Sequence, residues 1–216
     1  MNNEDLLKIL LQPKELITWH PEDYKYYGES TRHLQFFGQV NNRSAAMLIS
    51  QLHHLNDLEN ESLITIHLNT EGGDLTDALA IYDCIVNIQA PVCIIATGLC
   101  ASAGLLILSA GDYRMASQNT VFYYHQPVMS EGTINSIQAM ESVKDYYSFC
   151  QSTTDSIIRK RASISSKAWK RNFDQKTSYY FASPKALEYD LIDEILESKK
   201  LNYDFITDFE DDDDGE

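Results

Sequence analysis

The sequence has no long apolar run and comparatively little positive charge. No stretch approaches the roughly 18 apolar residues that a membrane-spanning helix needs, so we expect a protein without a membrane anchor. Its 17 Lys and Arg residues stand against 32 Asp and Glu residues, which gives a formal net charge of -15. Duplex nucleic-acid binders neutralise phosphates with Lys and Arg, and this charge balance argues against such a partner.

Cysteine is also scarce, and its spacing fits no metal site. The four cysteines fall inside apolar segments without CxxC spacing, and the six histidines form no ligand cluster with them. We therefore expect free, buried thiols in a reducing compartment, and we predict a cytoplasmic protein without metal or cofactor. The amino end has acidic residues and a short apolar run broken by Pro13, which does not match a secretion signal.

Acidic residues are concentrated at the carboxyl end of the chain. Seven of them lie in the last nine residues, DFEDDDDGE, which leaves only -8 of the net charge on the rest of the chain. We expect this tail to be disordered and solvated. The 216 residues suit one folded core, so the predicted organisation is an amino-terminal segment at 1–30, one domain at 31–200 and the acidic tail at 201–216.

Strand-like and helix-like segments alternate along the domain. Alternation and β-branched residues predict the strands, and apolar residues at a spacing of 3.6 predict the helices. Strands are predicted at 33–40, 62–69, 92–98 and 119–127, and helices at 42–58, 75–88, 102–110, 133–161 and 163–173. This order predicts an α/β fold with a parallel sheet core and right-handed crossover helices. The long, charged helix at 133–161 is predicted to project from the core.

Three predicted strand ends carry residues suited to catalysis, in the stretches EGGD, CASAG and YYHQP. The carboxyl ends of parallel strands lie at one edge of a sheet, so these stretches are expected to meet. Gly72 and Gly73 permit positive φ, and Ser102 is expected to open a helix whose first amides lack partners; together they predict an oxyanion hole. His125 is the residue type that activates a serine nucleophile. Taken singly, a turn, a helix cap and a structural histidine explain each residue as well.

In combination, these residues resemble a known family. The stretches HLNTEGGDLTDALAIYD, GLCASAGLLILSAG and YYHQP, in this order, are similar to the ClpP family of self-compartmentalised serine peptidases, within the ClpP/crotonase fold. The resemblance covers roughly residues 33–197. It implies that Ser102 is the nucleophile, that His125 is the general base, and that the backbone amides of Gly73 and Ala103 form the oxyanion hole.

The resemblance also implies an assembly. The helix at 133–161 would be the handle through which two heptameric rings of this chain stack as a tetradecamer. Its partners would be copies of itself, an AAA+ unfoldase such as a Clp ATPase, and polypeptide substrates, with no nucleic acid and no membrane. The reaction itself would need no ATP.

The sequence departs from the family pattern at three places. Ser178 stands where the family has its catalytic Asp, and Thr177 stands where it usually has an Arg beside that Asp. The glycine-rich strand after HQP keeps only Gly132. Asp174 lies four residues before Ser178 and would share a face with it if the segment were helical, so it is a candidate substitute acid.

Three functions remain open at this point. The first is a ClpP-type serine endopeptidase that works inside a ring chamber. The second is a catalytically impaired ring subunit that joins or modulates an active peptidase complex. The third, for which the Ser102 and His125 pair has no use, is a crotonase-like acyl-CoA enzyme.

Overall fold

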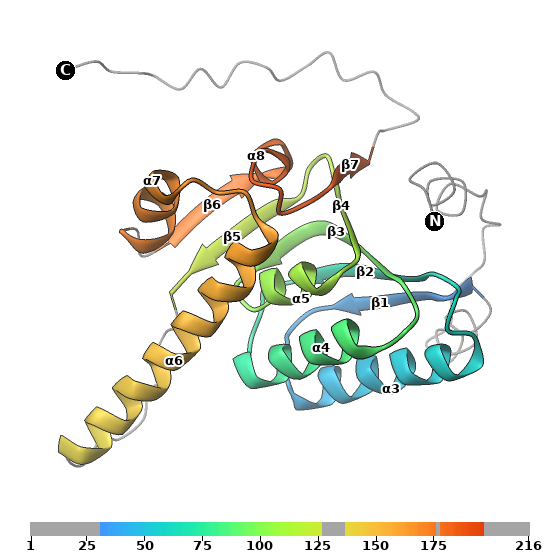
Figure 1. Ribbon diagram of the computed structural model, residues 1–216, viewed down its shortest axis with the longest axis horizontal. Helices are drawn as coiled ribbons and strands as arrows, with labels where there is room; N and C mark the ends of the chain where they lie inside the picture. The colour runs from blue at the N-terminus through green and yellow to red at the C-terminus, as the bar shows by residue number, and fades with distance from the viewer. Residues whose placement is uncertain (1–30, 127–136, 176–177, 197–216) are drawn as a thin grey trace. The chain divides into compact units, whose positions relative to one another are not determined.

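Seven strands form one sheet in the computed structural model, which describes residues 31–126, 137–175 and 178–196. The sheet order is β1-β2-β3-β4-β7, and β5 pairs with β3 and β6 (Figure 1). The elements are β1 (His33–Phe37), α3 (Asn42–Leu58), β2 (Ile64–Thr70), α4 (Leu75–Asn87), β3 (Val92–Ala101), α5 (Gly104–Ala110), β4 (Tyr113–Ser117), β5 (Val121–His125), α6 (Ile137–Arg161), α7 (Ser166–Trp169), the π-helix η1 (Lys170–Asp174), β6 (Ser178–Ala182), α8 (Ser183–Glu188) and β7 (Glu194–Leu196). All pairs are parallel except β5 with β6.

The predicted α/β fold with a mainly parallel sheet is confirmed, and so are the elements from β1 to α5, with small shifts of their ends. The sequence interpretation missed β4, β6, α8 and β7. The predicted helix at 163–173 is a short α-helix, α7, that continues into η1. The segments 1–30 and 201–216 lie outside the described residues, as does Gly132, so the three-part organisation stays a prediction. Within the described residues, no helix combines the length and apolarity needed to cross a membrane.

The helices α3, α4 and α5 pack along one face of the sheet (Figure 1). Two of them begin at side-chain caps. The Asn41 side chain accepts from the amides of Arg43 and Ser44 at the start of α3, and Asp74 caps α4 in the same way. Caps of this kind satisfy amides that the first helical turn leaves unpaired. The central strands β2 and β3 are almost wholly buried, as expected for parallel strands inside an α/β core.

Strand β3 changes its neighbour halfway along its length. Residues 93–96 pair with β4, whereas residues 99–101 pair with β5. The change falls at Gly98, which has φ 64, and the Asn69 side chain accepts there from the amide of Leu99. A positive φ at this position suits glycine, which has no Cβ to clash. The bend brings the end of β3 beside β5 and so places Ser102 near His125.

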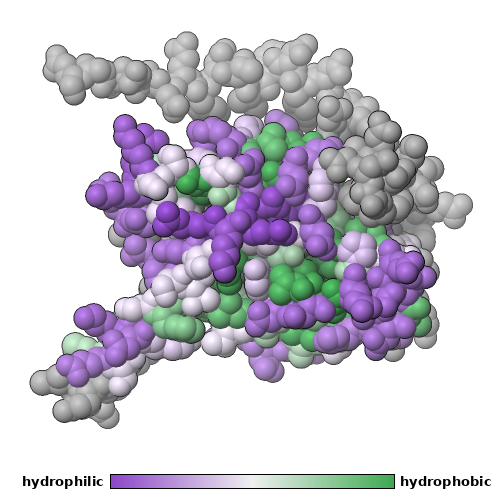
Figure 2. Space-filling view, in the orientation of Figure 1, coloured by the Kyte–Doolittle hydropathy of each residue, from purple (hydrophilic) through white to green (hydrophobic). Residues whose placement is uncertain are grey.

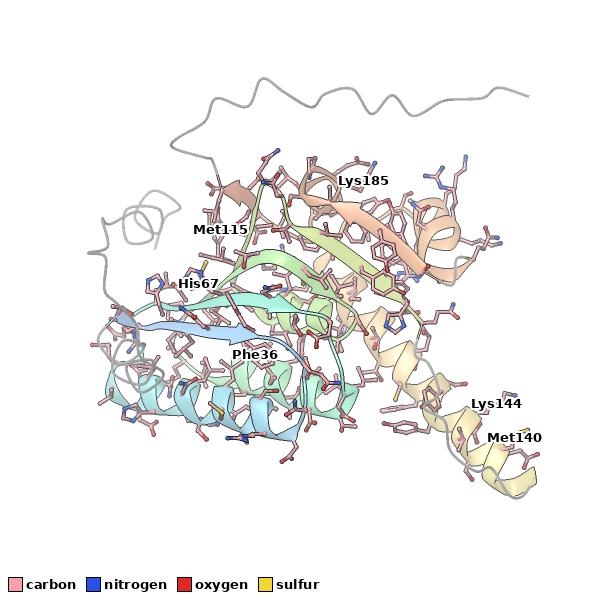
Figure 3. The ribbon with its side chains drawn as sticks, turned by 180° about the vertical axis from the view of Figure 1, so that it is seen from behind. Phe36, His67, Met115, Met140, Lys144 and Lys185 are labelled. Atoms are coloured by element: carbon pink, nitrogen blue, oxygen red, sulfur yellow. The ribbon has the colours of Figure 1, made fainter. Side chains whose placement is uncertain are left out.

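Helix α6 contacts the rest of the domain mainly through its carboxyl half. Cys150 and Ile158 are buried there, whereas Met140, Tyr146 and Phe149 keep about half or more of their surface exposed. Figure 3 shows Met140 near the end of α6 that lies farthest from the sheet. The predicted projecting helix is therefore confirmed for residues 137–161, and its first residues, 133–136, lie outside the described part.

Candidate active site

Ser102 lies in a tight turn between β3 and α5. Its φ is 55, which places a serine in the left-handed region, and α5 begins two residues later, at Gly104. The expectation that Ser102 opens the helix is therefore wrong: Ala103 is the N-cap residue, and Ser102 precedes it. The Ser102 amide donates to the Tyr123 carbonyl at 2.7 Å, and its carbonyl accepts from the Leu105 amide at 3.0 Å. A strained non-glycine residue held this firmly is typical of functional sites.

The segment after β2 packs its backbone directly against this turn. Gly72 has φ 89, and a Cβ added to it would lie 2.7 Å from the Cβ of Ser102 and 3.0 Å from the amide nitrogen of Ala103. The Thr70 hydroxyl accepts from the Gly72 amide at 3.0 Å and donates to the Gly38 carbonyl at 2.6 Å. Glycine at position 72 therefore permits the close approach of two backbone segments.

The two amides predicted to form the oxyanion hole have no hydrogen-bond partner among the described residues. Around Gly73, the Val40 amide donates to the Gly72 carbonyl and the Asp74 amide donates to the Val40 carbonyl, which leaves the Gly73 amide itself unpaired. In the turn at Ser102, the amides of Ser102 and Leu105 donate hydrogen bonds, whereas the Ala103 amide donates none among the described residues. Two unpaired amides in the same pocket as Ser102 suit a developing negative charge on a substrate oxygen.

His125 is the last residue of β5 and faces the same pocket as Ser102. Its Nδ1 donates to the Gln126 carbonyl at 2.7 Å, and its ring stacks on Tyr123 with centroids 5.2 Å apart. A carbonyl oxygen only accepts, so Nδ1 carries the proton and Nε2 of the neutral ring is left as an acceptor. Between the described residues, no hydrogen bond joins His125 to the Ser102 hydroxyl.

Ser178 lies directly opposite His125 in the antiparallel pair of β5 and β6. Opposed residues in such a pair have Cβ atoms about 5 Å apart, so position 178 lies within side-chain reach of the histidine ring. Because Ser178 begins a strand, the helical segment that would have placed Asp174 on its face does not exist. Asp174 instead ends η1, and its backbone carbonyl accepts from the Gln126 side chain at 3.2 Å.

A pocket of about 300 Å³ brings the four predicted site residues together. Ser102, His125, Gly73 and Ala103 all line it. The structure thus places all four at one concave surface, where the topology of the parallel sheet predicted that they would meet. What each of them does there stays a proposal.

Helix α6 supplies a wall of this pocket that the sequence analysis did not identify. Tyr146, Tyr147 and Cys150 line it opposite the strand ends. The paired tyrosines within a helical segment were the only sequence signal, and such pairs also occur on ordinary helix surfaces. Below them, the Tyr124 hydroxyl of β5 donates to Asp155 of α6 at 2.7 Å. Burial is the largest cause that raises the pKa of Tyr124, so this phenol stays protonated and keeps donating.

Three of the four buried thiols, those of Cys84, Cys93 and Cys100, are poor alternatives to Ser102 as nucleophiles. Burial raises the pKa of Cys93 to about 12 and also raises the pKa values of Cys84 and Cys100. A thiol reacts as its thiolate, which these environments disfavour. All four cysteines are free and buried, as the sequence predicted.

The fold has a counterpart among solved structures. The chain is similar to ClpP1 from Listeria monocytogenes, in a mutant form, with a TM-score of 0.71 and 24% sequence identity over 81% of this chain and 96% of that one. The expected ClpP-like fold is therefore confirmed.

Sequence comparison then gives the family. The family model for Clp protease matches residues 22–199. The ATP-dependent Clp protease proteolytic subunit of Streptococcus sanguinis (strain SK36) is 29% identical over 173 residues, which cover 79% of this chain and 87% of that protein. The chain belongs to the Clp protease family.

Proposed function

We propose that this chain is a serine endopeptidase that cleaves polypeptides with Ser102 as its nucleophile. One observation carries the proposal: a strained Ser102 shares one pocket with two unpaired backbone amides and with a histidine whose Nε2 is available to accept a proton. Nothing in this arrangement favours an acyl-CoA enzyme, and family membership supports peptide hydrolysis instead.

The proposed reaction follows from these positions. His125 Nε2 removes the proton from Ser102 as its Oγ attacks the carbonyl carbon of the peptide bond. The negative charge that forms on the carbonyl oxygen is stabilised by the amides of Gly73 and Ala103, each worth about 3 kcal/mol in such sites. His125 then gives the proton to the departing amine. In the second half of the reaction, His125 removes a proton from water as the water oxygen attacks the acyl carbon, and it returns the proton to the Ser102 oxygen as the acyl group leaves.

In this scheme the Gln126 carbonyl accepts the hydrogen bond from His125 Nδ1 and so keeps the proton on that nitrogen. In a complete triad a carboxylate does this. The carbonyl accepts from Nδ1 but carries no charge, so it stabilises the histidine cation less than a carboxylate does. Losing the carboxylate in the well-studied serine proteases lowers kcat about 10⁴-fold, yet the remaining groups still hydrolyse peptides faster than the uncatalysed reaction in water. We therefore expect slow hydrolysis.

A second function is favoured by the same deficit. A serine at position 178 and the absence of a Ser102–His125 hydrogen bond among the described residues suit a subunit that joins an active peptidase complex without cleaving substrate itself. This candidate keeps the fold and the assembly but assigns no chemistry to Ser102.

Both candidates share the proposed assembly. We propose heptameric rings of this chain, stacked as a tetradecamer and fed with unfolded polypeptide by an AAA+ ATPase. The exposed apolar side chains Met140, Tyr146 and Phe149 on α6 support a contact with a second copy, because a helix rarely leaves several such groups to water. The free, buried cysteines support a location in the cytoplasm.

The deciding experiment combines active-site labelling with peptide cleavage. Purified protein is treated with a fluorophosphonate probe and assayed with a short fluorogenic peptide, with Ser102→Ala as the control. We expect labelling at Ser102 and slow cleavage, both lost in Ser102→Ala, while the assembled size seen by light scattering does not change. If the assembled protein is labelled at Ser102 but does not cleave the peptide, or shows neither labelling nor cleavage, the result would favour the non-catalytic subunit.

A further inference from the structure

Five cations form an exposed basic patch on an otherwise acidic protein. They lie at the carboxyl end of α6 and on α7 and η1, where the sequence from 159 to 171 contains no acidic residue. The members of the basic patch are Arg159, Lys160, Lys167, Lys170 and Arg171. This charge is unusual because the chain as a whole carries -15.

The two parts of the basic patch are in contact. The Arg159 guanidinium lies 5.2 Å from the centre of the Trp169 ring, which joins the end of α6 to α7. Lys167 and Lys170 are three residues apart on the helical segment around that tryptophan, so their side chains share a face. Figure 2 shows hydrophilic side chains gathered over the carboxyl end of α6 and over α7.

No carboxylate among the described residues neutralises the patch. Among the described residues, ion pairs join Arg114 with Asp193 and Lys185 with Glu188, and neither pair includes a patch residue. Asp155, one turn before Arg159, is engaged by Tyr124 and Gln151. Asp174 borders the patch at the end of η1 and is the nearest acid in sequence.

The carboxyl end of the described chain lies close to this surface. The Arg114 guanidinium donates both to the Arg161 carbonyl, at 3.2 Å, and to the Asp193 carboxylate, at 2.6 Å. One guanidinium group thus contacts both the end of α6 and Asp193, and Asp193 lies three residues before Leu196, the last residue of β7. From Leu196 to position 208 the chain spans up to about 40 Å when extended.

We propose that the basic patch binds the terminal segment 208–216 of its own chain, DFEDDDDGE. The segment carries seven acidic residues against the five cations of the patch. Exposed ion pairs are individually weak, but a tether of this length raises the local concentration of the segment to the millimolar range, so several weak pairs act together. Other polyanions meet the repulsion of the whole acidic protein, whereas the terminal segment is already attached to it.

A competition experiment tests this intrachain contact. The probe is a fluorescein-labelled peptide of sequence DFEDDDDGE, and its binding is followed by fluorescence polarisation at low ionic strength. It is added to the full chain and to a full-length variant, called the neutralised variant, in which all seven acids of the terminal segment are replaced: Asp208→Asn, Glu210→Gln, Asp211→Asn, Asp212→Asn, Asp213→Asn, Asp214→Asn and Glu216→Gln. We expect the variant to bind the peptide at least about tenfold more tightly, because its patch is unoccupied. Added salt should weaken this binding.

A matched pair of charge removals locates the binding surface. In the neutralised variant, Lys167→Gln with Lys170→Gln should weaken peptide binding about tenfold, whereas Arg43→Gln with Lys144→Gln removes the same charge and should change it less than twofold. Arg43 lies on α3, and Figure 3 shows Lys144 on the part of α6 away from the sheet.

Four results would overturn the proposal. Equal peptide binding by the natural chain and the neutralised variant would mean that the segment does not cover the patch. Equal losses in the two charge-removal pairs would mean that only total charge matters. Competition that disappears on dilution would assign the segment to another copy. A single-stranded oligonucleotide that binds both full-length chains equally, and more tightly than the peptide, would identify nucleic acid as the occupant. None of these measurements depends on peptidase activity.

Discussion

The two sides of the candidate site are built differently. On one side, the turn at Ser102 is fixed by closely packed backbone. Gly72 lies against the turn, Gly73 packs on Val40, and two amides are left unpaired. On the other side, His125 is oriented by one hydrogen bond, to the Gln126 carbonyl, and by stacking on Tyr123, and it faces Ser178 across the strand pair. The backbone around Ser102 follows from the fold itself. The charge opposite His125, in contrast, depends on the side chain at position 178, which can change without disturbing the sheet. A preserved fold therefore says more about the oxyanion hole than about the histidine.

The largest effect is expected at the backbone side, from Gly73→Ala. The added Cβ would lie 2.1 Å from the Val40 carbonyl oxygen, and Gly73 has φ 148, so neither the space nor the backbone conformation suits alanine. We expect a loss of about 3 kcal/mol in the free energy of unfolding. Peptide cleavage should fall at least about 100-fold, because the Gly73 amide moves. Denaturant unfolding and the peptide assay measure the two losses.

Gly38→Ala is the matched control for this prediction. Gly38 also has a positive φ, 94, but a Cβ there would meet nothing within 4 Å. This variant should lose only about 1 kcal/mol, from backbone strain alone. If Gly73→Ala were as stable as Gly38→Ala, the close packing that distinguishes the serine side would be of no consequence.

The next effect concerns the histidine side, where Ser178→Asp should raise activity. A carboxylate opposite His125 replaces the Gln126 carbonyl as the partner of Nδ1 and stabilises the histidine cation. We expect kcat/KM for a fluorogenic peptide to rise about tenfold or more. Ser178→Asn has nearly the same shape without the charge and should give little gain. No gain from Ser178→Asp would indicate that the whole site is misaligned.

Asp174→Asn decides whether another acid already fills this role. Asp174 ends η1 and contacts Gln126 through its backbone, not through its carboxylate. We therefore expect Asp174→Asn to change peptide cleavage no more than Ser178→Ala does. A much larger loss in Asp174→Asn would show that its carboxylate reaches His125 during the reaction.

The contrast also shows what the sequence was able to predict. Alternating strands and helices were enough for the parallel sheet, and the rule that strand ends share one edge predicted that Ser102, His125 and Gly73 would meet. These predictions rest on local periodicity and on a rule that holds for open parallel sheets in general. The bounds of α3 were predicted without error from the periodicity of its apolar residues, and in the structure a capping box of Asn41 and Ser44 forms its start.

Features that depend on contacts distant in sequence were not predicted. The change of neighbour in β3 at Gly98 is accompanied by a hydrogen bond from the Leu99 amide to the side chain of Asn69, 30 residues earlier. The pairing of β6 with β5 is a long-range contact too, and it contradicts a helix through Ser178. The turn at Ser102 looked like a helix start because the residues after it are helical. Its positive φ and the hydrogen bond from its amide to the Tyr123 carbonyl, a contact distant in sequence, place it outside the helix.

The smallest effect returns to the serine side and measures the strain there. Ser102 has φ 55, a conformation that costs an ordinary residue about 1–2 kcal/mol and glycine almost nothing. Both Ser102→Ala and Ser102→Gly remove the nucleophile, but only glycine relieves the strain. We expect Ser102→Gly to unfold with a free energy about 1 kcal/mol higher than Ser102→Ala, because the relief exceeds the extra freedom of glycine in the unfolded chain. Asp190→Gly, at φ 54 in the turn after α8, should gain a similar amount over Asp190→Ala. If Ser102→Gly proved less stable than Ser102→Ala, the turn would hold its serine without strain.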